Sequence, residues 1–338
     1  MNRPIRRPHP QRPWRRLALS MAGLITAPAL AAGSPATCAA IADNTERLAC
    51  YDDAVGRTYR EAPPPAPPEN TPFSTRWELD AEDKQGTFVI KPHRPTYLLL
   101  TRVTDSANRA PHSRGDNHTV TENMDVAPVE AKYQLSFKTK LWEGLFGRHG
   151  DLWMGYTQQS SWQVYNKSNS APFRETDYEP ELMAAFRTNL DVGLGFKLKM
   201  LSVGFNHQSN GRAEPLSRSW NRVIAQAGIE RGDFALLVRS WYRLSEKDGK
   251  DDNPDITHYL GHGDIQAMWK LGDHGIGLNL RGPLWLSGQG SAQLDWSFPI
   301  HRNLKGYVQL FSGYGETLID YNHRQTTLGL GVMLVDWL

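Results

Sequence analysis

The sequence lacks a long apolar run, a strong net charge and more than two cysteines. No internal stretch among its 338 residues reaches the length of about 18 apolar residues that a membrane-spanning helix needs. The strands of a transmembrane β-barrel alternate in polarity, so this absence does not exclude a barrel. The formal net charge is only +2, without the basic patch typical of nucleic-acid binding. These absences exclude an ordinary helical membrane protein and give no sign of a nucleic-acid partner.

Three common catalytic motifs are also missing. The sequence contains no Walker A loop, no HExxH helix motif and no GxSxG elbow, the usual marks of phosphate-binding, zinc-dependent and serine-hydrolase sites. General disorder is excluded too, because the chain holds 11 Trp, 12 Tyr and 11 Phe, far more aromatics than a disordered chain carries.

The first 32 residues have the pattern of a secretory signal peptide. Six arginines precede the apolar run from Leu17 to Ala32, and no acidic residue accompanies them. The run ends in small residues, as a cleavage site does. An anchoring helix is the alternative, but the run is short and Pro28 interrupts it. We therefore expect an exported protein from which residues 1–32 are removed.

Residues 33–70 form a small segment that we expect to lie in the periplasm. Cys38 and Cys50 are its two cysteines, and in an exported protein they can form a disulfide. Two free thiols are the alternative, while no neighbouring His or Cys cluster supports a metal site. The proline-rich stretch of residues 62–68 reads as a spacer, so the main body extends from about residue 71 to residue 338.

The main body alternates in polarity with a period of two, which is typical of β-strands with two different faces. One such segment, residues 133–141, places Lys138 and Lys140 opposite its apolar face. A soluble sandwich would pack the apolar faces against a second sheet, but the charged opposite faces fit the polar interior of a barrel in lipid. About twelve segments of this kind fit into residues 71–338. The sequence thus predicts an all-β, twelve-stranded antiparallel transmembrane β-barrel, with both termini in the periplasm.

One predicted hairpin carries polar residues on its lipid-facing side. Phe205 belongs to the apolar face of the first strand, and the same parity continues to His207 and Ser209. The second strand has Val223 on its apolar face, and Asn221 shares that face. Polar side chains that face lipid are costly unless they interact with one another, so we expect these three to form a group.

The three residue types suit a nucleophilic triad. Ser209 would attack an ester carbonyl, His207 would take and return the proton, and Asn221 would hold the imidazole. Residues i and i+2 of a strand have Cα atoms about 7 Å apart, which lets a His and a Ser side chain meet. The alternative is that the strand has left the hydrocarbon and these are polar residues at headgroup level. His-x-Ser is too common a tripeptide for the spacing alone to decide.

Four blocks resemble the outer membrane phospholipase A family. Residues 204–222 look like its active-site hairpin, and residues 171–180, 251–257 and 312–321 resemble three further blocks. The resemblance spans about residues 71–338. It implies a calcium-dependent phospholipase of the Gram-negative outer membrane that hydrolyses acyl esters of phospholipids and lysophospholipids as a homodimer. An even strand count then places the active site near the extracellular rim.

The resemblance also implies roles for individual residues. Ser209 matches the nucleophile, His207 the base and Asn221 the orienting amide. The catalytic Ca²⁺ would be held by the backbone carbonyl of Arg212, the hydroxyl of Ser217 and, from the partner subunit, the hydroxyl of Ser170. These are the oxygen ligands that a hard cation prefers.

The resemblance leaves two points open, the second calcium site and the role of Gln158. A second calcium site of the family uses two acids, of which Asp252 matches one, while Glu214 stands where the other is expected. Gln158 projects from an apolar face and matches a Gln in the family's dimer interface, where an amide can bond in lipid; it could also lie near a headgroup.

Two other functions compete with the phospholipase. A porin-like or structural barrel would carry out no catalysis, but charged side chains such as Lys138, Lys140, Arg187, Asp264, Lys270 and Asp295 would largely fill a narrow twelve-stranded lumen. A lipid-binding barrel without turnover would require an unreactive Ser209.

Overall fold

The computed structural model describes residues 35–56, 71–145, 150–170, 172–247, 249–282, 289–302 and 304–336. The chain divides into two compact units, residues 1–67 and 68–338. The expected signal peptide and proline-rich spacer lie outside the described residues. None of the helices in the described ranges combines the length and the apolar character needed to cross a membrane.

The first unit contains two short helices, α1 (Pro35–Cys38) and α2 (Asn44–Ala54). Asp43 caps α2, because its side chain accepts hydrogen bonds from two backbone N–H groups of the first turn, at 2.9 and 3.0 Å. A disulfide joins Cys38 to Cys50 across a Cα–Cα distance of 5.5 Å. α2 itself has no buried residue.

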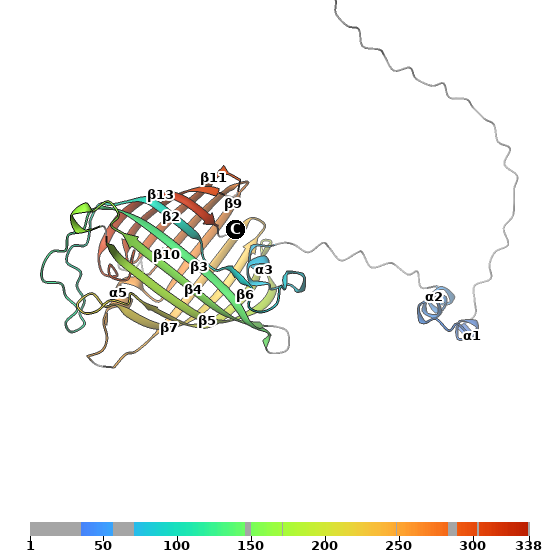
Figure 1. The fold of residues 1–338 in the computed structure, drawn as a ribbon. Helices are drawn as coiled ribbons and strands as arrows, with labels where there is room; N and C mark the ends of the chain where they lie inside the picture. The colour runs from blue at the N-terminus through green and yellow to red at the C-terminus, as the bar shows by residue number, and fades with distance from the viewer. Residues whose placement is uncertain are drawn as a thin grey trace, which may run out of the picture. The chain divides into compact units, whose positions relative to one another are not determined.

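The second unit is a closed antiparallel β-barrel, which confirms the predicted fold (Figure 1). The last strand, β13, pairs with β2 and closes the sheet. The barrel strands are β2 (Thr96–Thr104), β3 (Val129–Gly144), β4 (Gly150–Trp162), β5 (Phe173–Gly193), β6 (Phe196–Ser209), β7 (Ser219–Arg231), β8 (Phe234–Leu244), β9 (Gly263–Leu271), β10 (His274–Arg281), β11 (Ser291–His301), β12 (Leu304–Tyr314) and β13 (Arg324–Val335).

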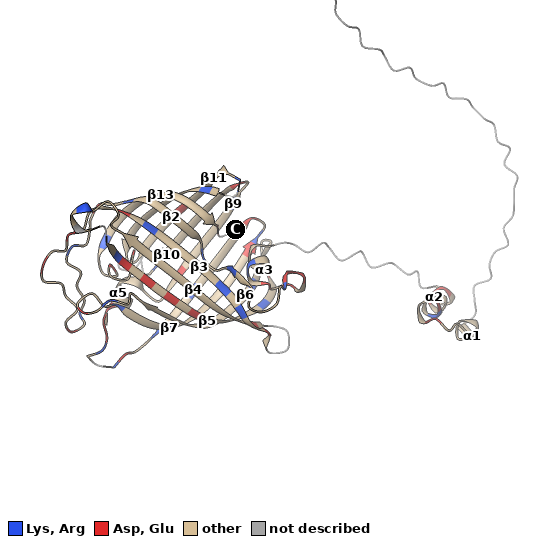
Figure 2. Cartoon of the chain, viewed as in Figure 1, with Lys and Arg blue, Asp and Glu red and all other residues tan. Residues whose placement is uncertain are grey.

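The two faces of the barrel wall differ as the alternation predicts. On β6, Val203 and Phe205 point outward and are exposed, whereas Ser202 and Asn206 point into the lumen and are buried. Charged residues recur along β3 and β5 (Figure 2). An apolar exterior and a polar lumen are what a barrel in a bilayer requires.

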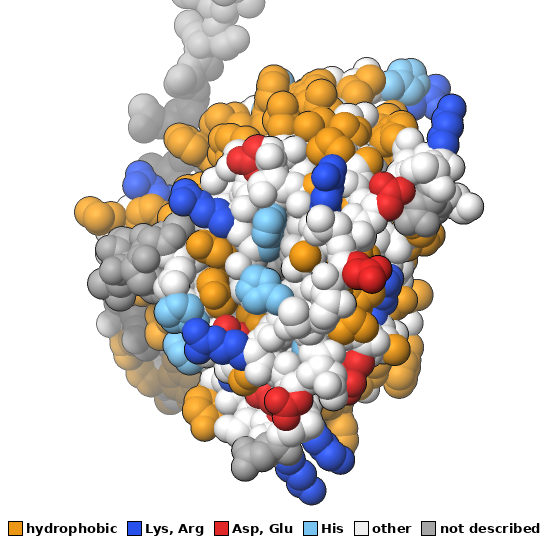
Figure 3. Space-filling view, turned by 90° about the vertical axis from the view of Figure 1, so that its left-hand side faces the viewer, with side chains coloured by type: hydrophobic (Ala, Val, Ile, Leu, Met, Phe, Trp, Pro, Cys, Tyr) orange, Lys and Arg blue, Asp and Glu red, His pale blue; other side chains and the backbone are white. Residues whose placement is uncertain are grey.

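The two ends of the barrel also differ. At one end, which we call the turn end, short turns near residues 194–195, 232–233 and 272–273 join successive strands. The other, the loop end, carries the long connections, among them residues 105–128, 163–172, 210–218, 245–262 and 315–323. These connections contain the short helices η2 (Lys167–Asn169) and α5 (Ile256–Leu260). Figure 3 views the loop end, where polar and histidine side chains cover much of the surface.

The first described residues of this unit, from Thr71, do not form a barrel strand but enter the lumen from the turn end. They build α3 (Pro72–Trp77), η1 (Ala81–Asp83) and the short strand β1 (Ile90–Pro92). Pro72 suits the first turn of α3, where its missing N–H is not needed, and Glu78 ends the helix with a φ of 53°. β1 pairs with β3 beyond the part of β3 that pairs with β2, so β1 and β2 lie end to end along it.

An apolar cluster surrounds α3 inside the barrel. Phe73 and Trp77 of α3 pack against lumen-facing side chains of β4, β5, β6, β8 and β9, and the Lys138 ammonium lies 3.1 Å from the Trp77 ring centroid. Charged residues therefore fill only part of the lumen, and Arg187 and Lys270 are exposed at the turn end. The cluster's barrel residues are Trp153, Met183, Ala185, Met200, Ala235, Leu237 and Met268.

The position of α3 predicts that Trp77 contributes strongly to stability. Trp77→Ala should lower the free energy of unfolding by roughly 3–5 kcal/mol, because a large buried ring leaves a cavity. Urea unfolding of the refolded chain in neutral detergent micelles measures the change. Phe88→Ala is the control, since Phe88 belongs to the same segment and is 72% exposed. An equal, small effect of both substitutions would contradict the role of α3.

Candidate active site

The hairpin of β6 and β7 brings the predicted polar residues together at the loop end. His207 pairs directly with Asn221 across the two strands, and Ser209 pairs with Ser219. On the other side of β6, Ser209 pairs with Tyr178 of β5. His207, Ser209 and Asn221 are all half-buried and share the outward face of the barrel with Phe205. The parity of the two strands predicts this arrangement.

One hydrogen bond orients the imidazole of His207. Its Nδ1 lies 2.8 Å from Oδ1 of Asn221. An amide oxygen can only accept, so Nδ1 carries the hydrogen and Nε2 keeps a free lone pair. Ser209 makes no hydrogen bond to His207 in the described part of the chain, and such contacts often form only once substrate is bound. The site therefore has an oriented base next to a hydroxyl on one strand.

Asn210, which the sequence analysis did not single out, shapes the loop after Ser209. Its side-chain nitrogen donates to Glu175 Oε1 at 2.9 Å and to the carbonyl oxygen of Leu216 at 2.8 Å. Its Oδ1 accepts from the backbone N–H groups of Arg218 at 2.9 Å and Arg212 at 3.3 Å. A side chain that bonds both ends of a loop fixes that loop. The run Asn210-Gly211 beside Ser209 was the available signal, because Asn and Gly dominate tight turns.

Asp252, in the connection of residues 245–262, contacts both the loop of residues 210–218 and the connection of residues 105–128. Its Oδ2 accepts hydrogen bonds from Ser217 Oγ at 2.7 Å and Ser219 Oγ at 3.2 Å. His118 Nε2 lies 3.1 Å from its Oδ1, and Ser113 Oγ donates to its carbonyl oxygen at 2.6 Å. The structure thus joins Ser217 and Asp252 into one polar cluster beside the triad residues.

The other predicted residues lie apart from this cluster. Ser170 is exposed in the connection between β4 and β5, and no described contact joins it to Asp252. Glu214 is exposed at the tip of the hairpin. Gln158 of β4 is half-buried, where its Nε2 donates to Tyr133 Oη at 3.2 Å and its Oε1 accepts from Tyr156 Oη at 3.1 Å. The Gln158 amide is therefore already bonded within one copy of the chain.

The donor set at Ser217 fits a hard cation. Ser217 donates its proton to Asp252, so the lone pairs of Oγ stay available, and the Arg212 carbonyl belongs to the same loop. Hydroxyl, carbonyl and carboxylate oxygens suit Ca²⁺ rather than soft metals. Among the residues that the structure describes, no group of three or more His, Cys, Asp or Glu side chains is placed to hold a metal.

Behind the hairpin, the lumen is filled by an ion-pair network around Glu179. This carboxylate accepts hydrogen bonds from Arg94 at 2.7 and 3.0 Å, from Arg222 at 3.0 Å and from Asn206 at 2.8 Å. Arg94 comes from the segment between β1 and β2, so the network joins this segment to β5, β6 and β7.

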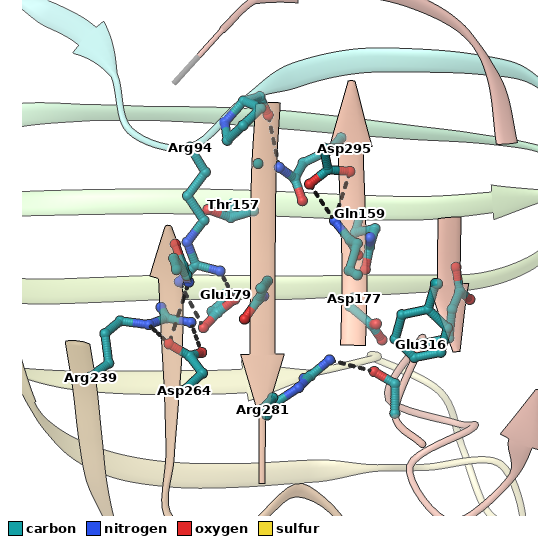
Figure 4. Close-up of a pocket in the computed structure, with 18 of the residues that line it drawn as sticks. Arg94, Thr157, Gln159, Asp177, Glu179, Arg239, Asp264, Arg281, Asp295 and Glu316 are labelled. Carbon is teal, nitrogen blue, oxygen red and sulfur yellow. Dashed lines mark hydrogen bonds and ion pairs between the residues drawn. The ribbon is translucent and has the colours of Figure 1, made fainter. Parts of the chain in front are cut away.

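A lumen cavity of about 150 Å³ borders the Glu179 network, and its lining also includes Arg239, Asp264 and Arg281 (Figure 4). None of the three triad residues lines this cavity. The geometry therefore separates the filled interior from His207, Ser209 and Asn221, which lie on the outward face.

A second buried network holds the connection between β12 and β13 at the loop end. Arg174 donates to Asp320 Oδ2 at 2.9 Å and bridges to Glu130. Burial alone would raise the pKa of Asp320, but the Arg174 charge, with hydrogen bonds from Asn108 and Thr317, lowers the pKa from 3.8 to about 2. Asp320 therefore stays ionised at neutral pH.

Comparison with known proteins identifies relatives over the whole barrel unit. The family model for phospholipase A1 matches residues 73–334. A putative phospholipase A1 of Neisseria meningitidis is 38% identical, over 88% of this chain and 90% of the relative. Phospholipase A1 of Escherichia coli K12 is 40% identical, over 75% and 84% respectively. The structure of a Salmonella typhi outer membrane phospholipase dimer with bound calcium is 37% identical, with a TM-score of 0.67 over 75% of this chain and 95% of that one.

The lowered pKa of Asp320 predicts a specific acid sensitivity. A carboxylate with a depressed pKa in the folded state stabilises above about pH 4, and this contribution of roughly 2 kcal/mol is lost as the pH falls towards 2. Asp320→Asn should lower the free energy of unfolding at pH 7 by about 2–4 kcal/mol and flatten its decline between pH 4 and 2. Urea unfolding in micelles across this range tests both effects. Asp116→Asn, at an exposed carboxylate, should change neither, and an unchanged slope for Asp320→Asn would refute the prediction.

Proposed function

Because the chain belongs to the phospholipase A1 family, we propose that it hydrolyses acyl ester bonds of glycerophospholipids and lysophospholipids with Ser209, His207 and Asn221. The observation that carries this proposal is the 2.8 Å contact of His207 with Asn221 on the outward face of an outer-membrane barrel. A bilayer lipid could reach that face laterally. A passive pore has less support, because side chains and α3 occupy the lumen.

The proposed reaction uses each triad residue for one task. The lone pair on His207 Nε2 takes the proton of Ser209 Oγ as this oxygen attacks the acyl carbonyl. Asn221 keeps the imidazole in the required tautomer. His207 then gives the proton to the departing glycerol oxygen, and water releases the fatty acid in a second round. The backbone N–H of Ser209 would donate to the developing oxyanion.

We further propose that the carbonyl of Arg212 and the hydroxyl of Ser217 hold the catalytic Ca²⁺, with Asp252 beside them. Bound Ca²⁺ would supply positive charge near the ester carbonyl. Asp252 orients Ser217 through the 2.7 Å hydrogen bond. The calcium named for the Salmonella typhi structure supports this proposal. Asp252 matches one acid of the family's second calcium site, while Glu214 stands at the position of the other and lies exposed at the tip of the hairpin.

Activity would then depend on pairing of two copies. Ser170 would reach the calcium site of the partner subunit, and the outward faces near Gln158 would meet in lipid. The named dimer of the Salmonella typhi relative supports this assembly. Three neutral oxygens make a weak site, so calcium binding and dimerisation should strengthen each other by reciprocity. We also place the loop end at the extracellular rim and the first unit in the periplasm.

The proposal predicts that Ser209→Ala removes most phospholipid hydrolysis. The expected loss is roughly three orders of magnitude or more, because the covalent route needs the hydroxyl. Fatty-acid release from mixed micelles with excess calcium measures the loss. Ser202→Ala is the matched control, since Ser202 lies on the same strand but faces the lumen, where its hydroxyl has no described hydrogen bond. Wild-type turnover by Ser209→Ala would exclude the triad.

Ser170→Ala should shift calcium activation without changing the reactivity of Ser209. We expect the calcium concentration for half-maximal activity to rise about tenfold, in step with the loss of crosslinked dimer. Labelling of Ser209 by a sulfonyl fluoride at saturating calcium should stay intact. Ser168→Ala, two residues away, is the control. Full activity of a monomeric form in excess chelator would contradict the coupling.

A further inference from the structure

A cavity of about 790 Å³ opens at the turn end of the barrel, away from the triad. One wall is the start of α3 with β1, and the other is the rim formed by the turns near residues 195 and 232. The rim is open beside Gly232, where an added Cβ atom would meet no other atom within 4 Å. The proposed hydrolysis uses no part of this cavity.

Basic side chains outnumber acidic ones in the lining. Arg76, Lys91, Lys197, Arg231 and Lys270 line the cavity, together with only two acids, Glu230 and Asp233. The cavity therefore has an excess of positive charge and favours an anion.

Of the two acids in the lining, Glu230 already has partners within the barrel. Glu230 Oε2 accepts the backbone N–H of Phe73 at 3.0 Å, and its Oε1 lies 3.9 Å from Lys199. Lys91 pairs with Glu78 at 2.5 Å. Arg231 and Lys270 differ, because no carboxylate of the described residues lies within 4.0 Å of either side chain. Both are exposed, and the Arg231 guanidinium lies 5.5 Å from the Phe196 ring centroid. These two cations are available to a ligand.

The cavity walls are held in place before any ligand arrives. Phe73 and Trp77 anchor α3 in the buried cluster, and Arg76 donates to the carbonyl oxygen of His93 at 3.1 Å. A preformed site costs less ordering on binding than a flexible one. Pro72 and Pro92 add apolar surface beside the cations, so the site suits an anion that carries a carbon skeleton.

We propose that this cavity binds a glycerophosphodiester anion. Arg and Lys together recognise phosphate, the first through its planar fork and the second as a point charge. The cavity far exceeds one phosphate group, which leaves room for the glycerol parts. In the proposed orientation the turn end lies at the periplasmic leaflet, so the ligand is either the headgroup of an anionic phospholipid or a free glycerophosphodiester.

The first experiment titrates deacylated glycerophosphoglycerol into the full chain in maltoside micelles and follows heat by calorimetry. We expect saturable 1:1 binding that weakens at least tenfold in Arg231→Glu and in Lys270→Glu. Arg302→Glu is the control, because Arg302 is exposed in a turn at the same end but does not line the cavity. The probe contains no acyl ester, so the result does not depend on the proposed hydrolysis. Absence of saturable binding, or an equal loss in Arg302→Glu, would overturn the proposal.

The second experiment separates the two sources of the ligand. The same titration is made in nanodiscs of ether-linked phosphatidylcholine, with and without ether-linked phosphatidylglycerol, neither of which can be hydrolysed at an acyl ester. Weaker binding of the soluble probe only in the presence of phosphatidylglycerol identifies the lipid headgroup as the ligand. Equal binding in both nanodiscs identifies the free glycerophosphodiester. Loss of binding in both nanodiscs would overturn the site.

Discussion

The carboxylate of Glu179 holds together the part of the barrel that supports the hairpin of β6 and β7, which carries the proposed triad. It accepts hydrogen bonds from Arg94, Arg222 and Asn206, and so joins β5, β6 and β7 to the segment that precedes β2. Removing one partner of such a buried pair costs about 3–5 kcal/mol. The outward residues of β6 and β7 alternate with members of this network, so the lumen sets the spacing of His207 and Asn221.

The same strands show how a barrel can carry the proposed triad on its outer side. Successive side chains of a strand point to opposite faces, so the residue next to each lumen-facing ion-pair residue points outward. At mid-height these neighbours are apolar, as Val203 and Phe205 are. Towards the loop end they change to His207 and Ser209, and Ser219, which pairs with Ser209, donates a hydrogen bond to Asp252 of a neighbouring loop. The proposed chemistry is thus placed where the apolar face meets the polar loops.

Local pattern predicted much of this structure. Alternation shows which side of each strand meets lipid, and it places His207 and Asn221 on the same outward face, where the two strands pair them. The residue types suggested the roles of the triad, and the resemblance favoured the triad over polar residues at headgroup level. Contacts between distant residues could not be predicted, including those of Asn210 and Glu179. The helix α3 was missed because six residues show no clear period, and its apolar partners lie more than 70 residues further along the chain.

The late position of those partners has a consequence for assembly. α3 is synthesised before every barrel strand, yet its socket is built from β4, β5, β6, β8 and β9. Phe73 bonds to Glu230, which lies 157 residues later. α3 therefore leaves the ribosome early but can dock only after strands as late as β9 have been made. Docking of α3 therefore requires that most of the barrel has already formed. Without α3, the apolar side chains of the cluster would be left unfilled in an otherwise polar lumen.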